Sequence, residues 1–406
     1  MSWIPVWGFL PVDQSLEPIP VSGIRRSLVF TNNVSGRRVR VKVSNLYGTE
    51  PVSVSRLALA DAVDGSLLTE LTVGGKRQFT LAPKGELWSD PAAFETRPGQ
   101  KLKVMIEFAD QSGQRVTTIG NSYSAFSFQA YSEFVRPAAG PEPSLPTVSA
   151  GGQAGQEATQ KAAPQPGAGI SYLVCEVQAD VEEGDTVRTV SCFGDSITSF
   201  DYFSGWLTKA FYQQFPGMVT VVNRGIGGNR LLRGPIVPIP YQDFRGFGPA
   251  GVKRFGSDTY RDETPTDVVL FICVNDLMHA RQFGHPEEAD TWQDMAEGIR
   301  KVCSIAHAHG SRIYVGTVTP FGIENGADWY KTSEQDRLHL NQYILDQGSR
   351  FCDGVMDFGK ALADPAHPDR QMPDCHVGDG LHPNSKGGKI MAALTFETMT
   401  GKKMPL

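Results

Sequence analysis

The hydrophobic pattern of the 406-residue chain changes at about residue 188. Before this point, apolar and polar residues alternate in runs such as RVRVKV at 38–43 and LKVMIEF at 102–108. Asn-Asn, Gly-Gly and Pro-Gly pairs separate these runs. A period of two predicts half-buried strands, so we expect an antiparallel β-sandwich in which each sheet has one solvated face. The valines of 38–43 would face the core and the cations would face solvent.

After residue 188, short apolar runs alternate with longer amphipathic stretches. This order predicts a parallel sheet of about five strands covered by helices, which is a three-layer α/β/α sandwich. The strands are expected at 189–193, 219–223, 268–274, 312–319 and 354–358, and the helices at 203–215, 292–308, 333–347 and 385–398.

We therefore expect two domains. The first is an all-β, jelly-roll-like sandwich over residues 1–182, and the second is an α/β domain over residues 187–406. Residues 137–169 are rich in Ala, Gly, Pro and Gln and contain no aromatic residue, which predicts a flexible loop within the first domain. The run ISYLVCEV at 170–177 predicts one more strand that returns to the sandwich.

Composition excludes several classes of protein. The formal net charge of −6 argues against nucleic acid or an anionic membrane as the main partner. No apolar run reaches transmembrane length. The first residues, MSWIPVWG, do not resemble a signal peptide, so we expect a cytoplasmic protein, or a secreted one if a leader has been removed.

The six cysteines are expected to be unpaired. Cys192 and Cys273 lie inside apolar runs, where burial is expected rather than pairing, and a chain of this size needs no disulfides.

Two short motifs carry the chemistry. Gly194-Asp195-Ser196-Ile197 follows the strand expected at 189–193, and Asp379-Gly380-Leu381-His382-Pro383 precedes the last helix. A serine hydroxyl becomes a good nucleophile when an imidazole removes its proton, and a carboxylate orients that imidazole. Ser196, His382 and Asp379 supply these three groups. This combination indicates a serine esterase.

Two further segments offer hydrogen-bond donors for a developing oxyanion. VVNRGIGGN at 221–229 ends in a glycine turn that contains Gly228, and VVLFICVND at 268–276 ends in Asn275-Asp276. Backbone N–H groups of a glycine turn and an Asn amide are suitable donors for a tetrahedral intermediate. Three of the four motifs follow expected parallel strands, and ligand sites gather at the carboxyl ends of such strands.

These four segments, in this order, resemble the SGNH hydrolases, also called the GDSL esterase superfamily, over roughly residues 187–400. The resemblance implies that Ser196 is the nucleophile, His382 the base and Asp379 its orienting partner. It also implies that the N–H groups of Ser196 and Gly228 and the side chain of Asn275 form the oxyanion hole. One position departs from the family, because Cys273 stands where the third block usually has glycine. No cofactor is implied.

The expected function is hydrolysis of a carboxylic ester through an acyl-enzyme. The segment NRGIGGNRLL, together with an N-terminal β-domain, resembles a bacterial branch of this family. That branch is itself similar to rhamnogalacturonan acetylesterases and other carbohydrate acetylesterases. The first expectation for the substrate is therefore an O-acetylated sugar or oligosaccharide. The alternatives are a general short-chain esterase or lipase of the same mechanism, and a non-catalytic carbohydrate-binding protein. The oligomeric state is left open.

Other polar and aromatic residues offer further hypotheses. Arg230 and Arg233 follow the glycine turn, and Trp329 and Tyr330 follow the fourth strand, so all four are candidates for contact with a sugar. Asp374, Cys375 and His376 could suggest a metal site, but zinc needs three or four converging ligands, and we expect no metal. The remaining histidines are expected at the surface or at helix ends: His279, His285, His307, His309, His339 and His367.

Overall fold

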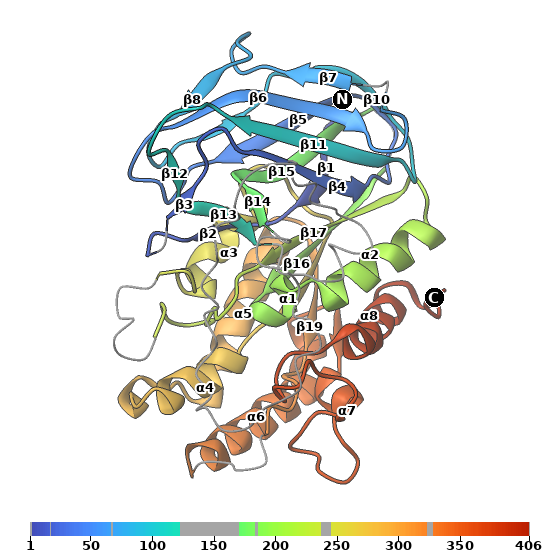
Figure 1. Cartoon of the computed structure of the whole chain (residues 1–406). Coiled ribbons are helices and arrows are strands. Elements are labelled where there is room, and N and C mark those ends of the chain that lie inside the picture. The colour runs from blue at the N-terminus through green and yellow to red at the C-terminus, as the bar shows by residue number, and fades with distance from the viewer. Residues whose placement is uncertain are drawn as a thin grey trace.

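The computed structural model of the chain describes residues 2–16, 18–65, 68–121, 170–182, 186–236, 245–322 and 328–405. The N-terminal part forms antiparallel β-sheets, and the C-terminal part forms a parallel sheet with helices (Figure 1). This arrangement confirms the fold class expected from the sequence. The flexible loop predicted at 137–169 lies outside the described residues.

Two antiparallel sheets of five strands each make up most of the N-terminal part. The first contains β1 (Ser2–Gly8), β15 (Val174–Val181), β5 (Gly36–Ser44), β10 (Ala92–Thr96) and β9 (Glu86–Trp88). The second contains β4 (Arg25–Thr31), β11 (Lys101–Phe108), β6 (Val52–Asp61), β7 (Leu68–Leu71) and β8 (Phe79–Leu81). Smaller sheets pair β12 (Arg115–Val116) with β3 (Ile19–Pro20), and β14 (Ile170–Tyr172) and β2 (Pro11–Asp13) with β13 (Thr118–Asn121).

The apolar side chains that the alternation predicted to be buried lie in the core between these sheets. Val39, Val41 and Val43 of β5 are fully buried. The alternate residues of β11, from Leu102 to Phe108, are buried with them. The strand predicted at 170–177 is present as β14 and β15, and β15 pairs with β5 in the first sheet.

The prediction that the cations of β5 face solvent holds for Arg38, which is exposed, but it is wrong for Lys42, and Arg40 is only partly exposed. Lys42 is only 8% exposed, and its Nζ lies 2.6 Å from Oδ2 of Asp262, a residue of the C-terminal part. The Arg40 guanidinium lies over the rings of Trp3 and Trp88, at 4.5 and 4.3 Å from their centroids. A sequence pattern cannot reveal this, because a face that another part of the chain covers has the same alternation as a solvated one.

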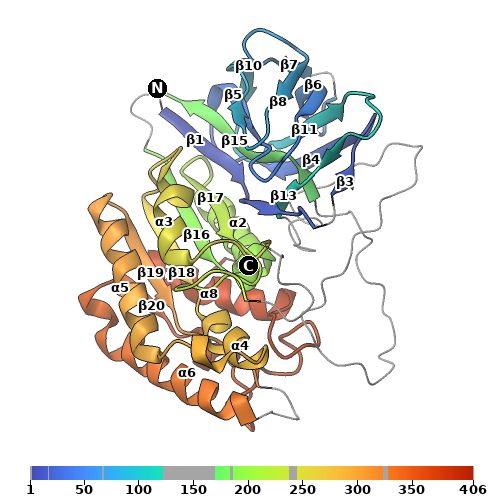
Figure 2. The same ribbon diagram turned by 90° about the vertical axis from the view of Figure 1, so that its left-hand side faces the viewer.

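The parallel sheet has five strands. In spatial order they are β17 (Val219–Gly225), β16 (Arg188–Gly194), β18 (Asp267–Phe271), β19 (Arg312–Gly316) and β20 (Gly354–Met356). Helices cover both faces, with α2 and α8 packed together on one face and α3 and α5 on the other (Figure 2). The helices are α1 (Ser196–Ser199), α2 (Tyr202–Gln214), α3 (Gly251–Tyr260), α4 (Val274–Gln282), α5 (Trp292–Ala308), α6 (Asp328–Gln347), α7 (Phe358–Leu362) and α8 (Ser385–Thr400).

Four helices and several boundaries differ from the prediction. The two short helices α1 and α7 and the longer α3 and α4 were not predicted. The third strand was predicted to reach Val274, whereas β18 ends at Phe271. The chain turns at Cys273, whose φ is +101°, and α4 starts at the next residue. No glycine or proline marks this turn, so the continuous apolar run 268–274 concealed it.

The sandwich covers the edge of the parallel sheet, because β1 packs beside the edge strand β17. The Asn33 side chain, which is buried, donates to the carbonyl oxygens of Phe215 and Val219 at 3.1 and 2.8 Å. Covering an edge strand protects its unpaired backbone groups from other chains.

A buried ion-pair cluster also lies at the seam, the interface between the β-sandwich and the edge of the parallel sheet. Nη2 of Arg224 donates to Glu176 Oε2 on β15 at 2.7 Å and to Glu263 Oε1 at 2.8 Å. Burial raises the pKa of Glu263 to about 7, since the attraction of Arg224 only partly offsets the desolvation and the repulsion by Glu176.

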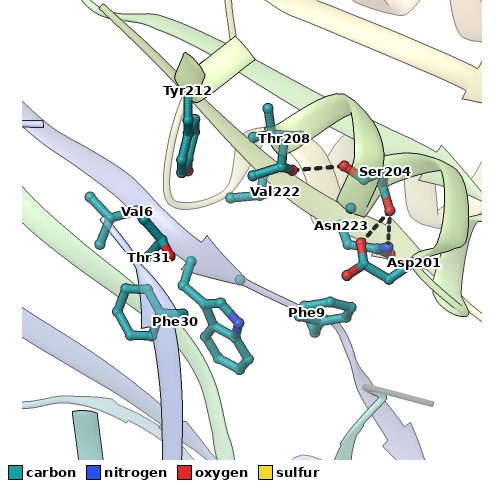
Figure 3. Close-up of a pocket in the computed structure, with 14 residues that line it drawn as sticks. Val6, Phe9, Phe30, Thr31, Asp201, Ser204, Thr208, Tyr212, Val222 and Asn223 are labelled. Carbon is teal, nitrogen blue, oxygen red and sulfur yellow. Dashed lines mark hydrogen bonds between the residues drawn. The ribbon is translucent and has the colours of Figure 1, made fainter. Parts of the chain in front are cut away.

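A small cavity of about 40 Å³ lies in the same seam, between β1 and β4 on one side and α2 and β17 on the other (Figure 3). On its α2 side, Asn223 Nδ2 donates to Ser204 Oγ at 2.9 Å and to the carbonyl oxygen of Thr198 in α1 at 2.6 Å. Ser196 and His382 are not among the residues that line it.

All six cysteines are buried and unpaired, which includes Cys192 and Cys273, the two whose burial the apolar runs predicted. Among the helices in the described ranges, none combines the length and the apolar character that a membrane crossing requires.

Candidate active site at the carboxyl edge of the parallel sheet

Three neighbouring strands deliver their motifs to one edge of the sheet. Gly194, the last residue of β16, pairs with Gly225 of β17 on one side and with Phe271 of β18 on the other. The segments that leave these three positions carry Ser196, Gly228 and Asn275. They begin side by side at one edge of the sheet, because these paired positions are neighbours across the three parallel strands.

Ser196 is the first residue of α1 and is 6% exposed. Asp195 caps this helix, since its Oδ1 accepts a hydrogen bond from the N–H of Ile197 at 3.0 Å. Position 194 must be glycine, because a Cβ there would lie 2.1 Å from the carbonyl oxygen of Phe271. The turn from β16 into α1 is therefore tight and presents Ser196 beyond the end of the strand.

The loop before α8 brings His382 and Asp379 to Ser196. Nε2 of His382 lies 2.8 Å from Oγ of Ser196, and Nδ1 of His382 lies 2.6 Å from Oδ2 of Asp379. The second carboxylate oxygen of Asp379 accepts from the backbone N–H groups of Leu381 and His382, both at 2.9 Å. The ring of Phe200 packs against the imidazole with a centroid distance of 4.7 Å. The imidazole is held on both nitrogens and on one face.

His376 shapes the same loop. Its Nδ1 accepts from the N–H groups of Gly378 and Gly380, both at 3.0 Å, while its neighbour Asp374 pairs with Lys386. Within the described ranges, no three His, Cys, Asp or Glu side chains converge as a metal site would require. His376 is thus a hydrogen-bond acceptor for the loop.

The glycine turn after β17 faces α1. Gly228 has a φ of +69°, and a Cβ at this position would lie 2.2 Å from the ring of Phe247. Both conditions select glycine. Among the described residues, neither the N–H of Gly228 nor that of Ser196 has an acceptor. These two donors are free to bind a ligand oxygen.

Asn275 lies in the first turn of α4 and is 2% exposed. Its Nδ2 donates to the carbonyl oxygen of Asn229 at 2.9 Å, which joins α4 to the glycine turn. An amide nitrogen carries two protons, so this bond uses only one of them. Asp276 reinforces the connection, because its two oxygens accept from the N–H groups of Leu231 and Leu232 at 2.8 and 3.0 Å.

The two aspartates next to the motif residues are fully buried. Burial raises the pKa of Asp195 to about 7 and that of Asp276 to about 7. Repulsion by Asp276 adds to the shift of Asp195, and repulsion by Asp290 adds to that of Asp276. A carboxyl group with a raised pKa binds its proton more tightly in the folded state than in the unfolded state. Both residues therefore lower stability as the pH rises from about 4 towards 7.

Cys273, the departure from the family pattern, adopts a backbone conformation that favours glycine. Its φ of +101° explains why glycine is usual there, and the side chain is fully buried. We expect the free energy of unfolding of Cys273→Gly to be about 1 kcal/mol higher than that of Cys273→Ala, because glycine avoids the steric cost at positive φ. Urea unfolding of the two variants measures this difference. Greater stability of the alanine variant would contradict it, since that is the usual order inside a helix.

The four candidate sugar contacts have different environments. Tyr330 is buried in α6, where its hydroxyl donates to the carbonyl oxygen of Asp369 at 2.9 Å. Arg230 is 2% exposed, and its Nε donates to the carbonyl oxygen of Gly234 at 3.0 Å. Trp329 and Arg233 are partly exposed. Only these last two are accessible from solvent.

His279 lies in the last turn of α4, as expected for a helix-end histidine, but its side chain is buried rather than solvated. It is 6% exposed on α4, one helical turn after Asn275, and its ring packs between Phe247 and Phe283. Burial and the nearby charge of Arg230 lower the pKa of His279 to about 3, so the ring is neutral. It supports Phe247, the residue that packs on Gly228.

The profile of the GDSL-like lipase/acylhydrolase family matches residues 192–390. This segment contains Ser196, Gly228, Asn275, Asp379 and His382. Residues 192–390 therefore form a GDSL-like acylhydrolase domain. A search of curated protein sequences finds no match to the chain.

Several solved structures resemble the GDSL-like domain. A putative acylhydrolase from Bacteroides fragilis is 21% identical, with 53% of this chain and 87% of that chain covered and a TM-score of 0.37. An aryl esterase from M. smegmatis is 14% identical, with 53% and 99% covered and a TM-score of 0.39. A variant of an acetyl xylan esterase from Geobacillus stearothermophilus is 17% identical, with 53% and 95% covered and a TM-score of 0.38.

Proposed function

We propose that this protein is a serine carboxylester hydrolase that works through an acyl-enzyme on Ser196. The observation that carries the proposal is the continuous series of short contacts from Ser196 Oγ through the imidazole of His382 to the carboxylate of Asp379. Such a series lets the imidazole take the serine proton as the hydroxyl attacks an ester carbonyl. Membership of an acylhydrolase family agrees with this chemistry.

In the proposed mechanism, Oγ of Ser196 bonds to the carbonyl carbon while its proton moves to Nε2 of His382. The N–H groups of Ser196 and Gly228 and the amide of Asn275 stabilise the oxygen that becomes negative. His382 then gives its proton to the leaving alcohol, and an acyl-serine forms. A water molecule, activated by the same imidazole, attacks this acyl group and releases the acid.

Replacing Asn275 by alanine tests the oxyanion assignment. Loss of one donor should lower kcat by about 10²- to 10³-fold with little change in KM, because the bond strengthens only as the oxyanion forms. Steady-state kinetics with p-nitrophenyl acetate measures both constants. An effect confined to KM would show that Asn275 binds the substrate rather than the transition state.

For the substrate, we propose an O-acetylated sugar or oligosaccharide. The support is the resemblance of the segment NRGIGGNRLL to carbohydrate acetylesterases, together with the open position of the His382 loop. Val377 is 51% exposed and the side chain of Asp379 is 42% exposed, so this loop borders solvent. We further propose that residues 1–182 act as an accessory domain that supports the catalytic domain at 187–406, since β1 covers its edge strand.

Acyl and alcohol preference test the substrate proposal. We expect kcat/KM to fall from acetyl to butyryl to octanoyl esters, and acetate to be released from acetylated oligosaccharides. Chromogenic esters of the three acids and a panel of acetylated oligosaccharides provide the comparison. Faster turnover of octanoyl esters, or no acetate from any oligosaccharide, would leave a general carboxylesterase of the same mechanism.

A further inference from the structure

Arg254 on α3 lies outside all four motifs and contacts the segments that carry two of them. Its Nη2 donates to the carbonyl oxygen of Gly194 at 2.7 Å, two residues before Ser196. Its Nη1 donates to the carbonyl oxygen of Arg224 at 3.0 Å, near the end of β17. One guanidinium therefore joins the carboxyl ends of two neighbouring parallel strands.

The same guanidinium holds the glycine turn. Nε of Arg254 donates to Oδ1 of Asn229 at 2.9 Å. The amide nitrogen of Asn229 donates in turn to the carbonyl oxygens of Phe247 and Pro249 at 2.7 and 2.8 Å, and its own carbonyl oxygen accepts from Asn275. Asn229 is fully buried and directly follows Gly228. The position of the Gly228 N–H thus depends on a side chain that Arg254 fixes.

The environment of Arg254 keeps its geometry fixed. The side chain is 3% exposed, its guanidinium lies 3.9 Å from the ring centroid of Phe193, and Nη1 also pairs with Asp258 at 3.0 Å. A planar guanidinium has donors on three nitrogens in fixed directions, whereas all three donors of an ammonium group lie on a single nitrogen at the end of a flexible stem.

We propose that Arg254 is a positioning residue that sets the distance between the Ser196 turn and the Gly228 turn, and so the geometry of the oxyanion hole. The inference rests on the proposed function, because it concerns the alignment of the proposed oxyanion donors. A displacement of about 1 Å in such a site can lower the rate by about 10²-fold. Arg254 acts through Gly194 and Asn229, without contact to the substrate.

The test compares Arg254→Met and Arg254→Lys with the wild-type protein. Arg254→Met should lower kcat by about 10- to 100-fold with KM changed less than about threefold, and a boronic acid that mimics the tetrahedral intermediate should bind more weakly by a similar factor. Arg254→Lys keeps the charge and should recover part of the loss. Arg337→Met is the matched control. Arg337 is also 3% exposed and donates to a backbone carbonyl oxygen, that of Val318 at 3.2 Å, but it does not contact the motif turns.

The control variant Arg337→Met should have a lower free energy of unfolding but keep its kcat within about threefold, because it loses buried hydrogen bonds that lie away from the motif turns. Equal kcat values for Arg254→Met and Arg337→Met, or a loss confined to KM, would overturn the proposal. If Arg254→Met does not fold, Arg254→Lys carries the same comparison.

Hydrogen exchange separates this proposal from the proposed function. In Arg254→Lys, peptides that cover 223–232 should exchange faster, and peptides that cover 296–306 of α5 should not change. If Ser196→Ala were as active as the wild-type protein, the proposed function would fail, and this local exchange would still decide whether Arg254 fixes the turn. Unchanged exchange at 223–232 would contradict its positioning role.

Discussion

Replacement of Ser196 by alanine is expected to lower kcat by about 10⁴- to 10⁶-fold, because no other hydroxyl could take its place in the acyl-enzyme. The Ser196 hydroxyl contacts Nε2 of His382 at 2.8 Å, and its removal leaves the cap of α1 by Asp195 in place. The fold should therefore persist. Hydrolysis of p-nitrophenyl acetate and circular dichroism spectra measure the two effects.

Ser191→Ala is the matched control for this variant. Ser191 lies on β16, is fully buried, and its hydroxyl has no hydrogen-bond partner among the described residues. The same chemical change five residues earlier should leave kcat within about twofold, as expected for a change away from the reacting atoms. A Ser196→Ala variant that kept more than a tenth of the wild-type rate would move the nucleophile elsewhere.

Replacement of Asp379 by asparagine is expected to lower kcat by about 10³- to 10⁴-fold, because an amide cannot stabilise the imidazolium that forms during catalysis. Burial would raise the pKa of Asp379, but the hydrogen bond and charge of His382 outweigh it, so the pKa lies below its usual value. The carboxylate therefore stays ionised while the pH falls through the range in which histidine gains a proton. Titration of Asp379 therefore does not account for a loss of activity at mildly acidic pH.

The pH–rate profile checks the assignment of His382 as the base. Wild-type activity should fall as the pH is lowered, because a protonated His382 cannot accept the proton of Ser196. Asp374→Asn is the matched control, since Asp374 lies in the same loop and pairs with Lys386. This control removes the same charge and should keep both the rate and the profile. A flat wild-type profile from about pH 5 to 8 would count against a histidine base.

Residue patterns were sufficient to predict the fold class. The period-two runs at 38–43 and 102–108 became β5 and β11, and the apolar runs after residue 188 became the five parallel strands. These elements could be predicted because the pattern of apolar residues within each segment determines which of its side chains are buried.

The contacts between distant parts of the chain could not be predicted from the sequence. The cations of β5 have the alternation of a solvated strand, yet Lys42 pairs with Asp262 of the other region. His279 was expected at the surface or at a helix end, and its burial between two phenylalanine rings arises only in the tertiary structure. Arg254 lies in a helix that was not predicted. Its role depends on three acceptors that come together only in the tertiary structure.

The five motif residues were named from sequence, and the structure places them at one edge of the sheet. Two of their supports could have been suspected, because Asn229 and Asp276 directly follow Gly228 and Asn275. Polar residues adjacent to a motif in a tight turn often hold it in place. The support by Phe247 could not have been foreseen, since nothing in the sequence relates it to Gly228.

Covalent labelling of Ser196 tests the central proposal most directly. A fluorophosphonate reacts with an activated serine and leaves a stable phosphoryl adduct on its Oγ, with loss of fluoride. Intact-mass and peptide-mapping mass spectrometry should find one adduct per chain, located on Ser196, absent in Ser196→Ala and formed much more slowly in Asp379→Asn. An adduct on a different residue, or ester hydrolysis that continues undiminished after complete labelling of Ser196, would contradict the account.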